Sequence, residues 1–144
     1  MLFFTGFSRT ASEVAKSKIA NLEKKSEELH NMRKMVDEAL DVLSSNADMR
    51  MIGEMLHQTW EYKRTLSSKV SNEAIDKIYA QARSAGAIGG KLLGAGGGGF
   101  LLLFVEPKKQ DLVKQALSEL ICVPFEFENS GTQIGYYQSY LKKQ

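Results

Sequence analysis

Apolar residues recur at helical spacing through the first half of the chain, after one short apolar run. The run Leu2 to Phe7 predicts a strand, and residues 10–13 (Thr-Ala-Ser-Glu) fit a capping box that would begin a helix. The apolar pattern then continues either on one long helix or on two helices with a break near His30 and Asn31. Its positions are Val14, Ala15, Ile19, Leu22, Met32, Met35, Val36, Ala39, Leu40 and Leu43.

Two further helices follow. The first ends in Lys63 and Arg64, cations that suit the C-terminal end of a helix dipole. The second is the clearest helix in the chain, because Ser71 or Asn72 can cap it and Gly86 can stop it. The apolar positions are Met49, Ile52, Met55, Leu56 and Trp60 on the first, and Ile75, Ile78, Tyr79 and Ala82 on the second.

After Gly86 the pattern changes to that of strands. Residues 89–94 and 100–105 predict two strands that flank a run of glycines, and Pro107 ends the second. Residues 112–120 predict a helix, the alternation in 123–128 predicts a half-buried strand, and residues 132–138 predict a last strand. A strand, a block of helices and then strand–strand–helix–strand–strand predict an α+β fold, with helices on one face of a mostly antiparallel sheet.

Composition narrows the class of protein. The chain has 144 residues, 43% of them hydrophobic and 25% charged, which fits one globular domain. A net charge of +2, dispersed along the helices, does not favour nucleic acid or an acidic membrane surface. One cysteine allows no internal disulfide, and with two histidines it cannot make a zinc site. We expect Cys122, in the apolar run "ICVPFEF", to be a buried and inert thiol.

The ends of the chain and its hydropathy bear on location. The opening residues "MLFFTGFSRT" have no basic segment and too short an apolar one for a signal peptide. No apolar run approaches the length of about 20 residues that spans a membrane. We therefore expect a cytoplasmic protein with no membrane segment.

The stretch "GAIGGKLLGAGGGGF", Gly86 to Phe100, holds eight of the twelve glycines. Gly94, Gly96 and Gly99 match G-x-G-x-x-G, but a dinucleotide fingerprint must open a helix, whereas a strand is expected here. A Walker A loop is also excluded, because Leu92 stands where Ser or Thr would bind magnesium. Two readings remain: a tight hairpin packed against the protein, or a backbone surface whose N–H groups hold an anion.

The same stretch resembles the third motif of the GHMP kinases, which reads approximately G-A-x-G-x-K-L-x-G-A-G-x-G-G and follows a helix. The wider segment from His57 to Val105 is most similar to the sugar kinase branch, which includes D-glycero-D-manno-heptose 7-phosphate kinase and the kinase part of L-fucokinase. The opening residues also resemble the start of the second half of those kinases. The resemblance covers essentially the whole chain.

The resemblance implies a fold and a reaction. The fold would be the C-terminal GHMP domain, over residues 1–144, with a helical layer packed on a ferredoxin-like antiparallel sheet. The reaction would transfer the γ-phosphoryl group of ATP to a sugar hydroxyl, here the anomeric one, by positioning and charge neutralisation. The nucleotide phosphates would meet the backbone of Gly94, Ala95, Gly96, Gly97, Gly98 and Gly99.

The resemblance also implies a missing partner. The phosphate loop with its magnesium-binding Ser, the catalytic Asp and the second motif belong to other parts of GHMP kinases, and none occurs in these 144 residues. We therefore expect no catalytic residue and no metal ligand in this chain. ATP and Mg²⁺ would be held together with an N-terminal kinase domain, and the chain alone would be inactive. A homodimer is left open.

The segment "WEYKR" supplies candidates for the substrate. Trp60, Lys63 and Arg64 share one helix face, so an aromatic ring could face a sugar and two cations its phosphate, with Ser67 in the loop beside them. The alternative is a core tryptophan with two solvated cations. We expect His57 to be a structural histidine with a hydrogen-bond partner, and His30 to lie on the surface.

Two functions of different classes are therefore open. The first is the C-terminal half of an ATP-dependent sugar kinase, with heptose 7-phosphate as the preferred substrate and a fucose-type sugar as the second. The alternative is a stand-alone ferredoxin-like module that binds a small molecule or regulates, and whose glycines serve packing alone.

Overall fold

The computed structural model describes residues 1–6 and 11–136, and its elements follow the predicted order. Phe7 and Thr10, which belong to the predicted first strand and capping box, and the end of the predicted last strand lie outside the described residues. The elements are β1 (Leu2–Phe4), α1 (Ala11–Ile19), η1 (Leu22–Lys25), α2 (Ser26–Ser44), α3 (Arg50–Thr65), α4 (Glu73–Ser84), β2 (Gly89–Leu92), β3 (Phe100–Phe104), η2 (Pro107–Lys109), α5 (Gln110–Ala116) and β4 (Ile121–Val123).

The four strands form one antiparallel sheet in the order β2-β3-β1-β4. Phe3 pairs with Leu101, which pairs in turn with Leu92, so these three side chains share one face. That face is packed against α4 and α5 and forms the core, with Ile75 and Val113 fully buried. The predicted α+β class is confirmed, and the order of strands is that of a ferredoxin-like sheet.

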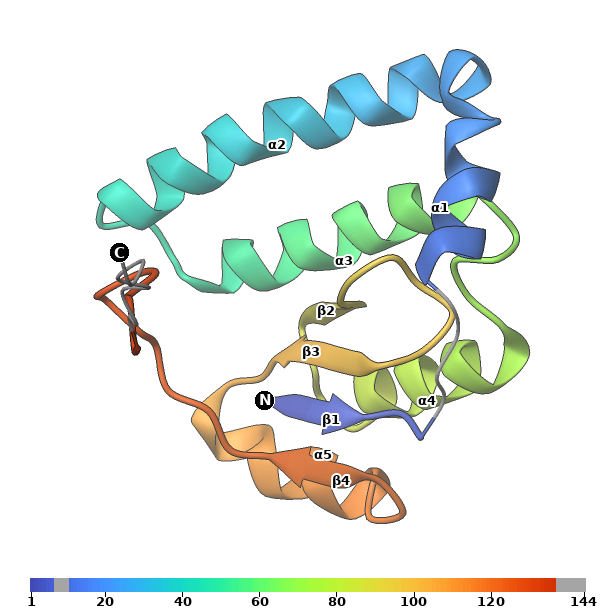
Figure 1. The fold of residues 1–144 in the computed structure, drawn as a ribbon. Helices are drawn as coiled ribbons and strands as arrows, with labels where there is room; N and C mark the ends of the chain where they lie inside the picture. Colours follow the sequence, from blue (N-terminus) through green and yellow to red (C-terminus); the bar gives the residue numbers. More distant parts are fainter. Residues whose placement is uncertain (7–10, 137–144) are drawn as a thin grey trace, which may run out of the picture.

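Helices α2 and α3 form an antiparallel pair beside the β2 edge of the sheet (Figure 1). Helix α3 approaches β2 so closely that a Cβ on Gly89 would overlap the carbonyl oxygen of Gly53. Only glycine fits at this contact. Gly89 therefore serves helix–strand packing before the loop itself begins.

Helix α4 begins as the sequence predicts. The side chain of Asn72 accepts a hydrogen bond from Ile75 N at 3.0 Å, which is an N-cap. Its apolar stripe of Ile75, Tyr79 and Ala82 is buried. The first helical block is divided earlier than expected, since η1 separates α1 from α2, whereas His30 lies inside α2. His30 is exposed, as predicted.

The C-terminal part of the chain departs from the prediction. Strand β4 covers Ile121–Val123, and residues 124–128 form no strand, because Pro124 has no N–H to continue the ladder. Phe127 is 92% exposed, so the predicted half-buried strand at 123–128 is wrong. Cys122 is exposed and not buried, because β4 lies at the edge of the sheet. Residues 132–136 are not in a strand either.

Candidate functional site

The glycine loop, residues 93–99, joins β2 to β3. Gly94, Gly96, Gly97 and Gly99 all have positive φ angles, between 68° and 116°. Residues other than glycine adopt this region rarely. The loop closes where Leu93 N donates to Phe100 O at 2.8 Å. The run of glycines is therefore required by backbone conformation.

The glycine loop is fixed to two other segments. Gly97 N donates to Val70 O at 2.8 Å, and a Cβ on Gly96 would lie 2.8 Å from both Cα and O of Val70. On the other side, the amide and the hydroxyl of Thr5 both donate to Gly99 O at 2.9 Å. Val70 and Thr5 are buried. These bonds anchor the middle and the end of the loop, while part of its backbone, at Gly94, stays uncovered.

That uncovered backbone can receive an anion. Within the described part of the chain, the amides of Ala95, Gly96 and Gly98 have no hydrogen-bond partner. Gly94 is exposed, Ala95 and Gly98 are half-buried, and Gly96 is buried. Successive free N–H groups in a turn are the usual form of an anion-binding nest. The glycine loop therefore presents donors of the kind that an anion-binding nest uses.

A lysine from α3 ends at the base of the glycine loop. Lys63 Nζ donates to Leu92 O at 2.7 Å and to Gly94 O at 2.8 Å. Its side chain is buried, and burial, followed by the nearby charges of Lys91 and Lys18, lowers its pKa to about 8. Neither predicted environment, a solvated cation or a cation on a sugar phosphate, describes this contact. The position of Lys63 on the helix face of Trp60 was compatible with burial, but its residue type predicted exposure.

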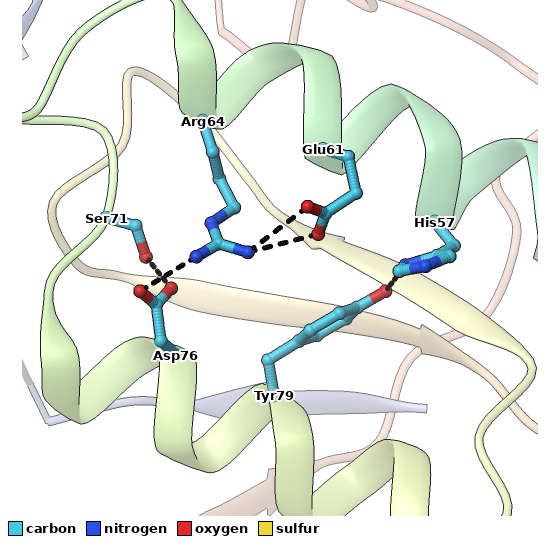
Figure 2. A network of polar contacts seen from close by, with 6 residues as sticks. All are labelled: His57, Glu61, Arg64, Ser71, Asp76 and Tyr79. Atoms are coloured by element: carbon cyan, nitrogen blue, oxygen red, sulfur yellow. Dashed lines mark hydrogen bonds and ion pairs between the residues drawn. The ribbon is translucent and has the colours of Figure 1, made fainter.

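The next residue of α3, Arg64, joins a different group of side chains (Figure 2). Its Nη1 donates to Glu61 Oε1 at 3.1 Å, and its Nη2 lies 3.0 Å from Asp76 Oδ2. Ser71 Oγ donates to Asp76 Oδ1 at 2.6 Å. We call Glu61, Arg64, Ser71 and Asp76 the α3–α4 network. Because two carboxylates already neutralise Arg64, the guanidinium is not an unpaired cation.

A polar pocket adjoins the α3–α4 network. Its lining consists of Glu61, Arg64, Thr65, Ser67, Ser68, Ser71 and Asp76. Ser67 is itself buried, and its hydroxyl lies 2.7 Å from that of Ser17 on α1. The pocket therefore offers carboxylate and hydroxyl groups in greater number than cations.

Trp60 does not have the predicted aromatic role. Its side chain is 0% exposed and belongs to the core, with its ring 6.2 Å from that of Tyr79. The prediction that the ring faces a sugar is therefore wrong, and the alternative, a core tryptophan, is what the structure shows. The apolar spacing of α3 already indicated this, because Trp60 follows Ile52 and Leu56 on one face.

His57 is a structural histidine, as predicted. Its Nδ1 lies 2.8 Å from Tyr79 Oη (Figure 2). Burial, followed by the charge of Arg83, lowers the pKa of His57, and burial raises the pKa of Tyr79 to about 12. Both groups are therefore neutral near pH 7, and they join α3 to α4.

Comparison with known proteins agrees with this architecture. The model of the family described as GHMP kinases C terminal matches residues 32–121. The D-glycero-alpha-D-manno-heptose 7-phosphate kinase of Campylobacter jejuni is 34% identical over 137 residues, which are 92% of this chain and 40% of that protein. The L-fucokinase/L-fucose-1-P guanylyltransferase of Bacteroides fragilis is 29% identical over 126 residues, 83% of this chain and 13% of that protein.

Solved structures show the same fold. L. major mevalonate kinase in complex with R-mevalonate superimposes with a TM-score of 0.68 at 20% identity, over 82% of this chain and 37% of that chain. The chain thus spans about two fifths of the heptose kinase and of this structure. In the described ranges, no helix is both long and apolar enough to cross a membrane. The segment that the family model matches includes α3, α4 and the glycine loop. The chain therefore belongs to the GHMP kinase C-terminal family.

Proposed function

We propose that this chain forms the C-terminal half of an ATP-dependent sugar kinase and that the glycine loop is one wall of its triphosphate pocket. The observation that carries the proposal is the loop itself, with four positive φ angles and free amides at Ala95, Gly96 and Gly98. A packing loop would need no such amides. A triphosphate uses them, because backbone N–H groups bind phosphate oxygens without a side chain in the way.

The charges around the glycine loop support the same ligand. The charges of Lys91 and Lys18 are close enough to Lys63 to lower its pKa. Within residues 1–6 and 11–136, none of these three lysines forms an ion pair with an acidic side chain. Three cations without counter-charges favour a polyanion nearby. ATP would supply the phosphoryl group, and the chain would bind and orient its phosphates.

The remaining groups belong to a second domain in this proposal. An N-terminal kinase domain would supply the catalytic carboxylate and the ligands of Mg²⁺, because the glycine loop brings none. Phosphoryl transfer depends on positioning and on neutralising phosphate charge, and both can be divided between two domains. The chain alone would then bind nucleotide weakly and transfer nothing.

The preferred substrate is D-glycero-D-manno-heptose 7-phosphate, phosphorylated at its anomeric hydroxyl. Support comes from the heptose kinase relative, which aligns over 92% of this chain. The polar pocket beside Arg64 and Ser67 offers the hydrogen-bonding groups that sugar hydroxyls need. The roles of these two residues in substrate binding remain predictions.

A reconstitution experiment tests the proposal. The chain is joined to the N-terminal three fifths of a GHMP sugar kinase, and transfer from Mg²⁺-ATP is measured with heptose 7-phosphate, L-fucose and mevalonate. We expect activity with the heptose, none from the chain alone, and a large loss in the double variant Gly97→Ala, Gly98→Ala. ATP turnover by the chain alone, or unchanged kinetics in the double variant, would contradict the division of labour and favour the alternative of a packing loop.

A further inference from the structure

We propose that Lys63 is a positioning residue that fixes the base of the glycine loop through the carbonyl groups of Leu92 and Gly94. The glycine motif from Gly86 to Phe100 does not include Lys63, which lies 31 positions before Gly94. The consequence for phosphate binding rests on the proposed function. The contact itself is a property of the chain without ligand.

The location of Lys63 explains what it contributes. Strand β2 is at the edge of the sheet, so its outward carbonyl groups have no neighbouring strand. Helix α3 packs against that edge, and Lys63 Nζ reaches Leu92 O at 2.7 Å and Gly94 O at 2.8 Å. Leu92 is the last residue of β2, and Gly94 is the first loop residue with positive φ. The ammonium therefore binds both sides of the point where the strand becomes the loop.

A buried lysine is a costly way to fill this position. Lys63 is 8% exposed, and no described carboxylate pairs with it. The charged groups that face it are Lys91 of β2 and Lys18 of α1, and both are cations. An apolar side chain of similar length would avoid the cost of desolvation. The hydrogen bonds to the loop are the compensation that the structure shows for this charge.

The other anchors of the loop make the role of Lys63 specific. Val70 O holds the middle of the loop through Gly97 N, and Thr5 holds its end through Gly99 O. Lys63 holds the beginning. Charge-assisted hydrogen bonds are about twice as strong as neutral ones. We therefore expect the loop to loosen at its start when the charge or the donor is lost.

Hydrogen exchange of the full 144-residue chain without nucleotide tests this role. The readouts are the amides of Leu93, Gly97 and Thr5, which donate in and around the loop, with the amides of α4 as internal reference. In Lys63→Met we expect the amide of Leu93, at the start of the loop, to exchange about tenfold faster, the factor for losing ~1.4 kcal/mol of local stability. The amides of Gly97 and Thr5 have their own anchors and should change less. The α4 amides should not change.

Lys91→Met is the matched control. It removes a neighbouring cation that has no hydrogen bond to the carbonyl groups of Leu92 and Gly94, so loop exchange should stay as in the wild type. Equal acceleration in both variants, or none in Lys63→Met, overturns the proposal. The wild type gives a second measurement that needs no variant. Lysine-selective NMR should show that the Nζ protons of Lys63 exchange with water more slowly than those of Lys91, because Lys63 Nζ donates to Leu92 O and Gly94 O.

The wild-type measurement also covers the case in which Lys63→Met does not fold. Loss of α4 protection in the variant would identify that case, and Nζ protons of Lys63 that exchange as fast as those of Lys91 would then overturn the role of Lys63. Binding of Mg²⁺-ATP is measured separately. Its absence in the wild type would contradict the nucleotide site and leave the loop contact untouched.

Discussion

Lys63 and Arg64 are neighbours in sequence, yet they serve two polar regions of opposite character. Lys63 is buried and bonds to backbone carbonyl groups at the start of the glycine loop. Arg64 is half-buried and bonds to the carboxylates of Glu61 and Asp76 in the α3–α4 network. The helical turn of about 100° per residue sends adjacent side chains to different surroundings.

The difference shows how each region holds its shape. The glycine loop is held by backbone groups and glycine conformations, so a single added methyl group can disrupt it. The α3–α4 network is held by side-chain charges close to solvent, where water and salt weaken each contact. Loss of one partner should therefore be severe in the first region and mild in the second.

Trp60→Ala should have the largest effect, because this side chain supports α3 beneath both regions. We expect the free energy of unfolding to fall by about 3–5 kcal/mol, the usual cost of removing a buried aromatic side chain. Urea unfolding followed by circular dichroism measures it. Met51→Ala, on the same helix but 44% exposed, is the control and should cost under about 1 kcal/mol. Unchanged stability in Trp60→Ala would instead favour the prediction that the Trp60 ring faces a sugar.

Gly96→Ala should be the most damaging single change within the glycine loop. The new Cβ would lie 2.8 Å from Val70 Cα and O, at a φ of 116°. We expect a loss of about 3 kcal/mol from strain and displacement. Gly94→Ala is the matched comparison, since no atom lies within 4 Å of its Cβ position, and about 1–2 kcal/mol is expected from φ alone. Equal losses at both positions would show that close packing against Val70 does not matter.

The pH dependence of stability should separate Lys63 from Arg64. The folded-state pKa of Lys63 is about 8, below its ordinary value of 10.5, so the unfolded chain binds more protons between these values. The contribution of Lys63 is therefore unfavourable below pH 8 and improves as pH rises from 8 to 10.5. The raised pKa of Tyr79 acts in the opposite direction from pH 10 to 12.

The measurement for Lys63 is the difference in unfolding free energy between the wild type and Lys63→Met from pH 7 to 10. That difference should shift in favour of the wild type as pH increases, because the titrations of all other groups contribute equally to both proteins and cancel. Arg64→Met should show no such trend, because arginine keeps its charge over this range. A difference that does not vary with pH would contradict the burial of a charged Lys63.

The α3–α4 network should give the smallest effect. Arg64 and Asp76 side chains are 34% and 37% exposed, so we expect their coupling in a double-mutant cycle of Arg64→Met and Asp76→Asn to be about 0.5 kcal/mol. Raising the salt concentration should reduce it further. A coupling above about 2 kcal/mol would mean that the network is as rigid as the glycine loop, and the contrast between the regions would fail.

The fold could be predicted to a large extent because its signals are local. The cap at Asn72, the stripe of Ile75, Tyr79 and Ala82, and the stop at Gly86 act within one helix, and α4 follows them. Residues 123–128 misled the prediction for the opposite reason. Alternating apolar residues give a strand only where another strand or layer receives them, and β4 has a neighbour on one side alone.

The candidate site could likewise be predicted from the sequence only in part. The glycine loop was recognisable because it is contiguous, and positive φ angles demand glycine wherever they occur. Its anchors were not recognisable, because Thr5, Lys63 and Val70 lie in three distant segments and have ordinary residue types. The Cys122 prediction failed because exposure depends on packing partners that the sequence does not name, whereas the apolar spacing of α3 already favoured the alternative of a core Trp60.

The sequence by itself determined the helices, the strands around the loop and the need for a bare backbone at Gly94 to Gly99, since these follow from spacing and from the conformational freedom of glycine. The tertiary structure decided which side chains meet that backbone. It buried Lys63 against Leu92 and Gly94 and paired Arg64 with Asp76, because contacts between distant segments depend on how α3 packs against β2 and α4.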